Sequence, residues 1–384
     1  MSTEDRKRLI TEIEKERGSK VIVFFCGDRP LAPTAIADDA IRPMYEHLRA
    51  LERRPEKLDL YLYSLGGVME TPWKIVTMLR EFCSELSVVV PYKAYSAATM
   101  IALGADKISM IDKSELGPID PQLNVTAGPD RPQFLLPQIG VEDVASYVTF
   151  LRQRAGLTDQ AALAGSVAAL VSSLTPALLG RIERIYSHIR LVARKLLSLA
   201  RPPIDDRRVT AIIEALTEKT YVHGHGIGRQ EAKEIGLNLE MLEGQVAKLV
   251  WDLYTDYEDL LKLLGSHDPR AYFEETAPDT YEEKNEFFAC IESAKLLHAF
   301  KGNFWLQRIR RIPPNPTINI NLNLQLPANL QAQQLTQQLQ QLLSQLLQQA
   351  GHQIQQMVQQ QIAQQSPIDR IEGGIVGGKW ETIS

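Results

Sequence analysis

Two short segments combine glycine and serine in a pattern that could support nucleophilic catalysis. The first, YLYSLGGV, ends in Gly66 and Gly67, and the second, YSAATM, places Ser96 next to Ala97. Each follows an apolar run of strand length and precedes a helical pattern. The first amides of a helix lack partners within it and can bind an anion. If the two helix starts face each other, the Gly67 and Ala97 amides converge beside the Ser96 hydroxyl, as in a nucleophile with an oxyanion hole.

Each motif also has a purely structural interpretation. Ser-x-Gly-Gly is common in tight turns, and Ser96 could simply cap a helix. The catalytic interpretation gains specificity because the two motifs occupy successive strand–helix units, which should belong to one sheet.

The surrounding pattern indicates how these segments are held. A charged helix is expected first, over residues 2–17, and short apolar strands then alternate with helices, which predicts a mainly parallel sheet buried on both faces. The expected strands are 21–25, 58–63, 86–90 and 108–111, and the expected helices are 35–53, 68–82 and 96–105. Helical periodicity continues over 140–200, 207–218, 229–236 and 240–264. A Pro- and Gly-rich loop is expected over 124–137.

These motifs resemble the Clp protease/crotonase superfamily, most closely its signal peptide peptidase A class and the SDH-type (serine dehydrogenase) proteinases. The matching stretches are YLYSLGGVMETPWKIVTMLRE, VVVPYKAYSAATMIALGADKISM and SELGPIDPQL, followed later by GRQEAKEIGLNLE. The resemblance implies an α/β fold, a spiral of ββα units. It also implies that Ser96 is the nucleophile, that Gly67 and Ala97 hold the oxyanion, and that Gly66 lies in the substrate-binding corner.

The general base is left open. Where the Clp subunit has its histidine, this chain has Ile119 or Asp120, and near the lysine of the signal peptide peptidase class it has Gln138. His223 and His225, in the loop YVHGHGIG, are the alternatives, because a neutral imidazole can accept a proton. The structural alternative for this pair is a Gly-flanked surface loop.

Other residues that could do chemistry favour structural roles. His188 lies between arginines on a predicted solvated helix face, and Lys93 fits a surface lysine. The two histidines of VHGH could bind a metal, but no carboxylate or cysteine lies close in sequence. We therefore expect no metal site and no cofactor.

The C-terminal region differs in composition from the rest of the chain. No Asp, Glu, Lys or Arg occurs between Ile312 and Ile368. Residues 317–326 alternate polar and apolar side chains, as in a strand. The Gln-rich stretch 331–365 has apolar residues at heptad spacing, which predicts a self-associating coiled-coil helix; the alternative is a disordered polar tract. The apolar positions are Leu335, Leu339, Leu342, Leu346, Leu347, Ala350, Ile354 and Met357.

The expected organisation is an N-terminal helix (1–19), a Clp/crotonase-like serine peptidase core (20–264), a mixed helical extension (265–311) and a C-terminal oligomerisation segment (312–384). The net charge of −5 argues against nucleic-acid binding. The charged N-terminus and the lack of a long apolar stretch predict a cytoplasmic protein without an integral membrane segment. Three widely spaced cysteines fit a reducing compartment.

The leading functional hypothesis is a homo-oligomeric serine endopeptidase that hydrolyses peptide or protein substrates through a Ser96 acyl-enzyme. The first alternative is a catalytically impaired or inactive Clp-fold protein that assembles or binds peptides, as the missing base suggests. The second is a crotonase-type acyl-CoA enzyme, which uses two oxyanion amides without a nucleophile.

Overall fold

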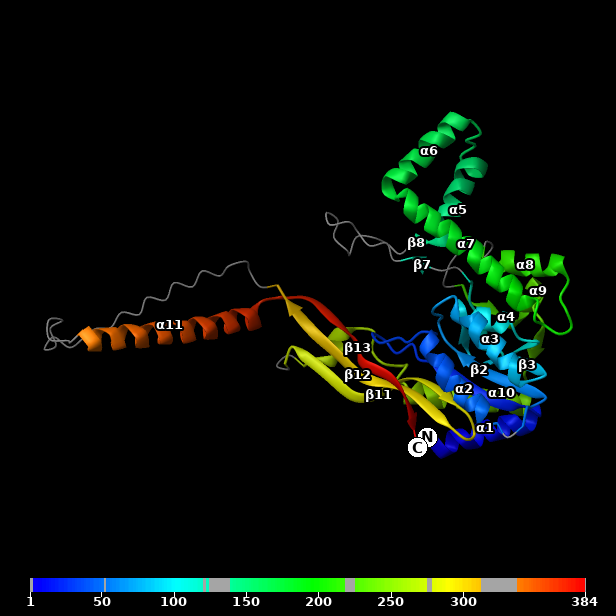
Figure 1. The fold of residues 1–384 in the computed structure, drawn as a ribbon, viewed down its shortest axis with the longest axis horizontal. Coiled ribbons are helices and arrows are strands. Elements are labelled where there is room, and N and C mark those ends of the chain that lie inside the picture. The colour runs from blue at the N-terminus through cyan, green and yellow to red at the C-terminus, as the bar shows by residue number, and fades with distance from the viewer. Residues whose placement is uncertain are drawn as a thin grey trace. The chain divides into compact units, whose positions relative to one another are not determined.

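The computed structural model describes residues 3–51, 53–119, 122–123, 139–217, 225–274, 278–311 and 337–383 (Figure 1). The chain divides into two compact units. The first contains residues 1–265, 284–303 and 377–384, and the second contains 266–283 and 304–376.

The first unit is built on a sheet whose central strands are parallel. These are β1 (Lys20–Cys26), β2 (Lys57–Tyr63), β3 (Glu85–Val90), β5 (Lys107–Met110) and β10 (Leu239–Met241). The sheet order is β10-β5-β3-β2-β1-β11-β12-β13, and β11 pairs antiparallel with β1. The α/β class and the four strands predicted from the apolar runs are confirmed.

Successive side chains of each central strand enter two different cores. In β1, Ile22 and Phe24 pack into one core, whereas Val21, Val23 and Phe25 pack into the other. This period of two is what a strand requires, and burial on both faces explains the continuous apolar runs.

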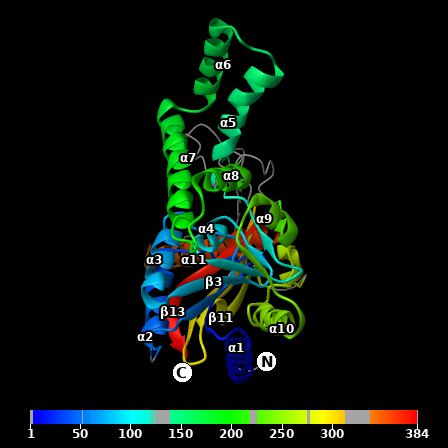
Figure 2. The same ribbon diagram turned by 90° about the vertical axis from the view of Figure 1, so that its right-hand side faces the viewer.

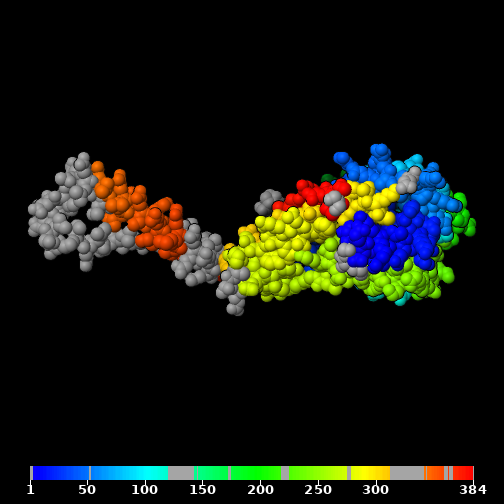
Figure 3. Space-filling view, turned by 90° about the horizontal axis from the view of Figure 1, so that it is seen from below, coloured from blue at the N-terminus to red at the C-terminus, as the bar shows by residue number. Residues whose placement is uncertain are grey.

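Helices cover both faces of this sheet (Figure 2). One core includes side chains from α2 (Ile41–Arg49), α3 (Thr71–Phe82) and α4 (Ala97–Leu103), and a short 3-10 turn, η1 (Asp38–Ala40), precedes α2. The other core includes side chains from α1 (Thr3–Arg17) and α10 (Gly244–Leu260), which contact each other. Figure 3 shows α1, in blue, at the molecular surface with α10 beside it.

A small second sheet adjoins the ends of the central strands. It contains β4 (Lys93–Ala94), β6 (Glu115–Leu116) and β9 (Ile227–Gly228), in that order. Because β4 ends at Ala94, two positions before Ser96, this sheet fixes the backbone that leads into the candidate site.

A helical region follows the short β7 (Gln122–Leu123) and β8 (Ile139–Gly140) strands. Its elements are α5 (Val141–Thr149), a π-helical turn η3 (Phe150–Arg154), α6 (Gln160–Ser173), α7 (Pro176–Leu197), α8 (Asp206–Thr217) and α9 (Arg229–Ile235). The second half of α7 packs into the core through Ile189, Val192 and Leu196. None of the described helices is by itself long and apolar enough to cross a bilayer. By length and composition alone, Gln160–Val171 and Pro176–Leu197 pass that test as a pair, bent by 99°.

The expected mixed helical extension over 265–311 is wrong for most of its length. After a 3-10 turn, η4 (Pro269–Tyr272), the chain forms two long strands, β11 (Thr280–Glu292) and β12 (Leu297–Arg310). The last strand, β13 (Ile368–Ile383), lies next to β12 in the sheet order. In β11 the first half is mostly exposed and rich in Glu and Lys, which is why its composition did not indicate a strand.

The second unit contains the Gln-rich helix and the outer strand segments. Helix α11 (Gln337–Gln365) confirms a helix over most of the Gln-rich stretch. Arg310 on β12 bonds both carboxylate oxygens of Asp279, at 2.7 and 2.8 Å. The predicted strand over 317–326 and the predicted loop over 124–137 lie outside the described residues.

Candidate active site

The diglycine corner follows β2 and is held by a loop far away in sequence. The Ile36 amide donates to the Gly66 carbonyl at 2.8 Å, and the Val68 amide donates to the Ile36 carbonyl at 2.8 Å. Gly66 and Gly67 have φ values of +126° and +155°. These backbone conformations favour glycine, and a Cβ on Gly67 would lie 2.1 Å from the Ile36 carbonyl oxygen.

Ser96 lies between β4 and α4. The Tyr95 amide donates to the Ser64 carbonyl at 2.9 Å, which ties the approach to Ser96 to the strand that leads into the diglycine corner. Ser96 itself has φ +51° and occupies the N-cap position of α4 without making a side-chain cap. A non-glycine residue at positive φ is uncommon and stores strain, a feature that concentrates at functional sites.

The structure brings the two motifs together. A Cβ built on Gly66 would lie 2.9 Å from Ser96 Cβ and 3.4 Å from Ser96 Oγ. The Ser96 side chain is 8% exposed. Its hydroxyl makes one contact among the described residues, a weak one of 3.6 Å to the Met69 sulfur. The hydroxyl is therefore next to the diglycine corner and is not used to cap its own helix.

The amides predicted to hold an oxyanion are those of Gly67 and Ala97. In an extended segment, neighbouring peptide groups point to opposite sides. Because Gly66 O and Val68 N–H both bond Ile36, the Gly67 N–H points away from that loop. Ala97 begins α4, where the first amides have no partner within the helix. Within the described part of the chain, no backbone hydrogen bond is found from either amide.

A partly buried polar pair, Tyr95 and Glu115, supports the backbone just before Ser96. The Tyr95 hydroxyl donates to Glu115 Oε2 at 2.7 Å, and burial together with this carboxylate raises the pKa of Tyr95 well above its ordinary value. The Tyr95 ring also lies against Gly117, where an added Cβ would come within 2.6 Å. Tyr95 is therefore a neutral packing residue that orients the segment before Ser96.

The predicted histidine base is not in contact with the serine. The Nε2 atom of His225 lies 3.0 Å from a carboxylate oxygen of Glu231, and the His225 side chain is 46% exposed. His225 directly precedes Gly226, at which a Cβ would come within 3.3 Å of the Tyr95 hydroxyl. His225 thus belongs to the neighbourhood of the candidate site, on the chain that enters β9.

Several positions discussed for the base lie outside the described residues: Asp120, Gln138 and His223. Ile119 is fully buried, and its amide donates to the Leu216 carbonyl at 3.0 Å. Lys93 lies 4.7 Å above the Tyr92 ring, and His188 is exposed on α7.

Sequence reasoning missed Ile36 and Met69. Ile36 closes one side of the diglycine corner by an isolated parallel bridge to Gly67. Met69 lies just after the corner and meets the Ser96 hydroxyl. Proximity to the GG motif could have indicated Met69, whereas nothing local marks Ile36, because its partner is about thirty residues away in sequence.

Comparison with known proteins finds a family similar to the N-terminal third of the chain. The family model of the ClpP-like SDH-type serine proteinases matches residues 1–131, a range that includes both halves of the candidate site. The resemblance to this class predicted from the motifs is confirmed over that range. Two uncharacterized proteins of Methanocaldococcus jannaschii are also similar. One is 25% identical over 65% of this chain and 78% of its own length, and the other is 26% identical over 66% and 76%.

Solved structures whose fold is partly similar include proteases and a probable enoyl-CoA hydratase/isomerase. A membrane-bound stomatin-specific protease is 15% identical, with a TM-score of 0.35 over 55% of this chain and 76% of that one. A ClpP1 from Listeria monocytogenes is 12% identical, with a TM-score of 0.32 over 62% and 98%. A probable enoyl-CoA hydratase/isomerase from Mycobacterium abscessus is 14% identical, with a TM-score of 0.27 over 60% and 73%.

Proposed function

We propose that this protein is a serine endopeptidase that cleaves peptide bonds through an acyl-enzyme on Ser96. The Ser96 oxygen attacks the peptide carbonyl, and the hydroxyl proton passes to a base and then to the leaving amine. Water hydrolyses the resulting ester and regenerates the hydroxyl. The amides of Gly67 and Ala97 stabilise the oxyanion in both tetrahedral intermediates.

One observation carries this proposal: Ser96 is held at φ +51°, with its side chain against Gly66. A serine that only capped a helix would accept a hydrogen bond from a first-turn amide, and Ser96 makes no such cap. Instead, the strained backbone turns the hydroxyl toward the diglycine corner. The match of residues 1–131 to a serine proteinase family supports the same assignment.

The proposed substrate is an extended peptide with apolar side chains beside the scissile bond. Leu65 and Val68, on either side of the diglycine corner, are 41% and 47% exposed. Because the Gly66 carbonyl and the Val68 amide both bond Ile36, the N–H and C=O of Gly67 point to the other side, where an extended chain could pair with them as an added strand. Exposed apolar side chains beside that edge would then contact alternate residues of the substrate.

For the general base we propose one of the two histidines near β9, His223 or His225. His225 precedes β9, which pairs with β6 next to β4, and His223 lies two positions earlier in the sequence. If His225 is the base, substrate binding would have to draw its imidazole from Glu231 toward Ser96. General-base catalysis contributes about 10²–10⁴-fold, so replacing that histidine with Gln should slow acylation by about that factor.

The test is covalent labelling by a fluorophosphonate, which reacts with activated serines, followed by mass spectrometry of the labelled peptide. We expect the label on Ser96 and its loss in Ser96→Ala. Ser187→Ala is the matched control, because Ser187 is exposed on α7 and, among the described residues, its side chain bonds only Glu183, at 3.0 Å. A label that stays absent from Ser96 in the wild-type protein rules out the acyl-enzyme.

A second candidate is a peptide-binding protein without turnover. It is favoured by the single weak contact of the Ser96 hydroxyl with Met69, since an unactivated serine is a poor nucleophile. Saturable binding of apolar peptides without labelling or cleavage would establish it.

In either case we propose a homo-oligomer, because α11 carries exposed apolar residues at the predicted heptad positions.

A further inference from the structure

The backbone at Ser96 needs support from the segments on either side of it. Its φ of +51° is uncommon for a residue with a side chain, and such strain persists only where the surrounding structure over-determines it. Strand β4 ends at Ala94, before the serine, and helix α4 begins at Ala97, after it. A contact that joins these two elements would therefore fix the direction of the Ser96 hydroxyl and of the Ala97 amide.

The side chain of Thr99 makes such a contact. Its hydroxyl oxygen lies 2.7 Å from the carbonyl oxygen of Ala94, and both residues are fully buried, so that water does not compete for this hydrogen bond. A threonine within a helix usually bonds the carbonyl three or four positions earlier. Here the acceptor is five positions earlier, outside the helix, and Ser96 lies between the two partners. Thr99 thus closes a short loop around the strained residue.

The same hydroxyl also reaches the segment that follows β6. The Gly117 carbonyl oxygen lies 2.8 Å from the Thr99 hydroxyl, and the Gly117 amide donates to the Ala94 carbonyl at 3.1 Å and to the Thr99 hydroxyl at 3.3 Å. A hydroxyl has one proton to donate and two lone pairs to accept. Thr99 can therefore accept from the Gly117 amide while it donates to one of the two carbonyls. One side chain joins α4 to the ends of both β4 and β6, which pair with each other.

These contacts connect the start of α4 to the diglycine corner. Ala94 is followed by Tyr95, whose amide donates to the Ser64 carbonyl at 2.9 Å, on the chain that leads from β2 into that corner. Through Ala94, Thr99 therefore holds α4 at a fixed position relative to the corner. If this link were lost, the Ala97 amide could move with α4 while the corner stayed in place, and the predicted oxyanion donors would no longer converge.

We propose that Thr99 is a positioning residue for the candidate active site. Its hydroxyl acts through the backbone and holds the Ser96 hydroxyl and the Ala97 amide in the arrangement that an oxyanion hole requires. The inference rests on the proposed role of Ser96 as a nucleophile. The alternative is a threonine that only satisfies buried carbonyls and adds stability. The two differ in whether the reactivity of Ser96 follows the hydroxyl of Thr99 or the overall stability of the protein.

Two substitutions separate the hydroxyl of Thr99 from its bulk. Thr99→Val keeps the shape and removes the hydroxyl, whereas Thr99→Ser keeps the hydroxyl and removes a buried methyl group. We expect Thr99→Val to lower the maximal rate of fluorophosphonate labelling of Ser96 by about 100-fold, as a small misplacement can do, without weakening probe binding. Thr99→Ser should be labelled at nearly the wild-type rate although it melts at a lower temperature, because the lost methyl group leaves a cavity.

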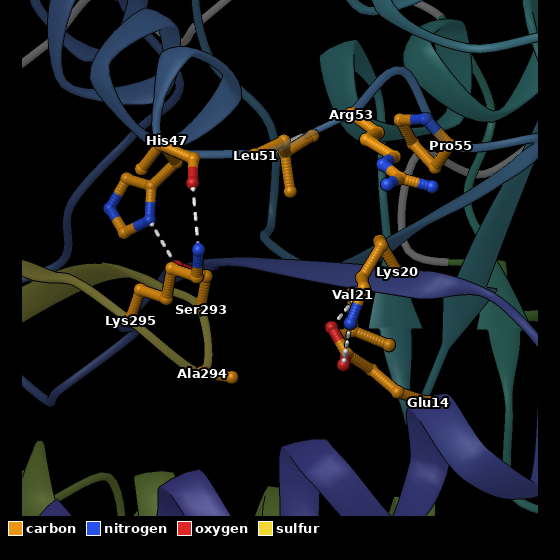
Figure 4. Close-up of a pocket in the computed structure, with 11 residues that line it drawn as sticks. Glu14, Lys20, Val21, His47, Leu51, Arg53, Pro55, Ser293, Ala294 and Lys295 are labelled. Atoms are coloured by element: carbon orange, nitrogen blue, oxygen red, sulfur yellow. Dashed lines mark hydrogen bonds and ion pairs between the residues drawn. The ribbon is translucent and has the colours of Figure 1, made fainter.

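Ser293 provides the matched control, because it carries a buried hydroxyl at the other edge of the sheet. Figure 4 shows it beside His47 in a pocket of about 310 Å³ that is also lined by Lys20, the first residue of β1. Ser293 Oγ lies 2.8 Å from His47 Nδ1. Strands β1, β2 and β3 run parallel, and Ser96 follows their carboxyl ends. Ser293→Ala should therefore lower the melting temperature, measured by circular dichroism, and leave the labelling rate of Ser96 unchanged.

A thiol at position 96 tests the positioning role without peptidase chemistry. The three cysteines of the chain are buried, so alkylation of the Ser96→Cys protein by iodoacetamide reports the introduced thiol. Amides at a helix start lower the pKa of a thiol below its ordinary value of about 8.5. We expect the pH profile of alkylation to give such a lowered pKa, and Thr99→Val added to Ser96→Cys should return it toward about 8.5. Ser293→Ala should leave it unchanged.

The outcomes separate this inference from the proposed function. If fluorophosphonate never labels Ser96 but the thiol pKa depends on Thr99, the acyl-enzyme fails and the positioning role stands. If Thr99→Val changes neither the labelling rate nor the thiol pKa, the positioning role is overturned. Equal labelling rates of Thr99→Val and Thr99→Ser overturn it as well, because the hydroxyl would then not matter. Should Thr99→Val fail to fold, Thr99→Ala and Thr99→Ser form a second pair that differs in the hydroxyl alone.

Discussion

Gly66 lies directly against the side chain of Ser96. A Cβ on Gly66 would be 2.9 Å from Ser96 Cβ, closer than real Cβ contacts occur, and Gly66 has φ +126°. The absence of a side chain at position 66 is thus what allows the corner after β2 to approach the serine before α4. The glycine serves the site in two ways, through its backbone conformation and through the space that it leaves.

The first prediction concerns this contact. Gly66→Ala should abolish or strongly reduce fluorophosphonate labelling of Ser96, because the methyl group must displace the serine. The unfavourable φ should also lower the free energy of unfolding by about 1–3 kcal/mol. Labelling rates and urea denaturation measure the two effects separately.

Gly165→Ala serves as the control for that substitution. Gly165 lies within α6, where a Cβ would meet nothing within 4 Å. Alanine favours the helix over glycine by about 0.5–1 kcal/mol, so this variant should be as stable as the wild type or more stable. If Gly66→Ala is still labelled at the wild-type rate, the reactivity of Ser96 does not depend on the diglycine corner.

The second prediction is a pH dependence of stability that originates at His47. Burial, assisted by the neighbouring His298, lowers the pKa of His47 to about 3. An unfolded histidine titrates near 6.5, so the unfolded state binds the proton more tightly. This contribution to stability is fully present above pH 6.5 and is lost progressively as the pH falls toward 3. Between pH 6.5 and 5 the loss should be about 2 kcal/mol.

Urea denaturation of wild type and His47→Gln at pH 7 and pH 5 checks this. The variant cannot take up the proton, so its stability should fall by about 2 kcal/mol less between the two pH values. If the wild type and His47→Gln lose the same free energy of unfolding between pH 7 and pH 5, His47 is not the source of the pH dependence.

Much of the fold could be predicted because its signals are local. The apolar runs of β1, β2 and β3 follow from burial on both faces, and the glycines at 66 and 67 follow from the turn that they make. Ser96 could be singled out because a serine at the start of a helix of small residues is visible in the sequence.

The rest depended on contacts between distant segments. The bridge from Ile36 to Gly67 has no local signal, and β11 is a strand because it pairs with β1 despite the charged composition of its first half. His47 likewise contacts Ser293 and His298, which lie about 250 positions away in sequence. Such contacts depend on how the strands pair in the fold, and no periodicity in the sequence indicates them.

The third prediction concerns Arg17, which joins four strands at the end of α1. Its guanidinium pairs with Asp59 on β2 and donates to Ser109 on β5 and to Glu240 on β10, each of the latter at 3.0 Å. It also donates to Ser87 on β3 at 3.4 Å. Burial alone would raise the pKa of Glu240, but hydrogen bonding from Ser109 and the charge of Arg17 bring it below its ordinary value.

Arg17→Met should lower the free energy of unfolding by about 3–5 kcal/mol, because Asp59 is left buried without its counter-charge. Arg8→Met on the same helix is the control. Its side chain is 65% exposed, and within the described part of the chain it pairs with Asp5 and Glu12 alone, so the change should stay below about 1 kcal/mol. Urea denaturation measures both, and similar losses for the two variants would mean that the strand contacts of Arg17 add no stability.

The fourth prediction concerns assembly through α11. Leu342, Leu346 and Met357 are 60%, 56% and 60% exposed on this helix, and their spacing predicts packing against the same helix of another copy. Replacing all three with Gln should lower the sedimenting mass of the full-length protein. Substitution is a sharper test than removing residues 312–384, because truncation also removes β13, whose Trp380 donates to Asp39 at 3.0 Å.

A triple Gln→Ala variant on the opposite side of α11 provides the matched control. Gln341, Gln348 and Gln355 lie roughly half a turn away from the apolar positions at 100° per residue. Alanine preserves helix propensity, so this variant should sediment as the wild type does. If both triple variants keep the wild-type mass, the helix does not mediate assembly, and its apolar residues must have another partner. If both dissociate, the loss reflects helix stability and not a specific apolar stripe.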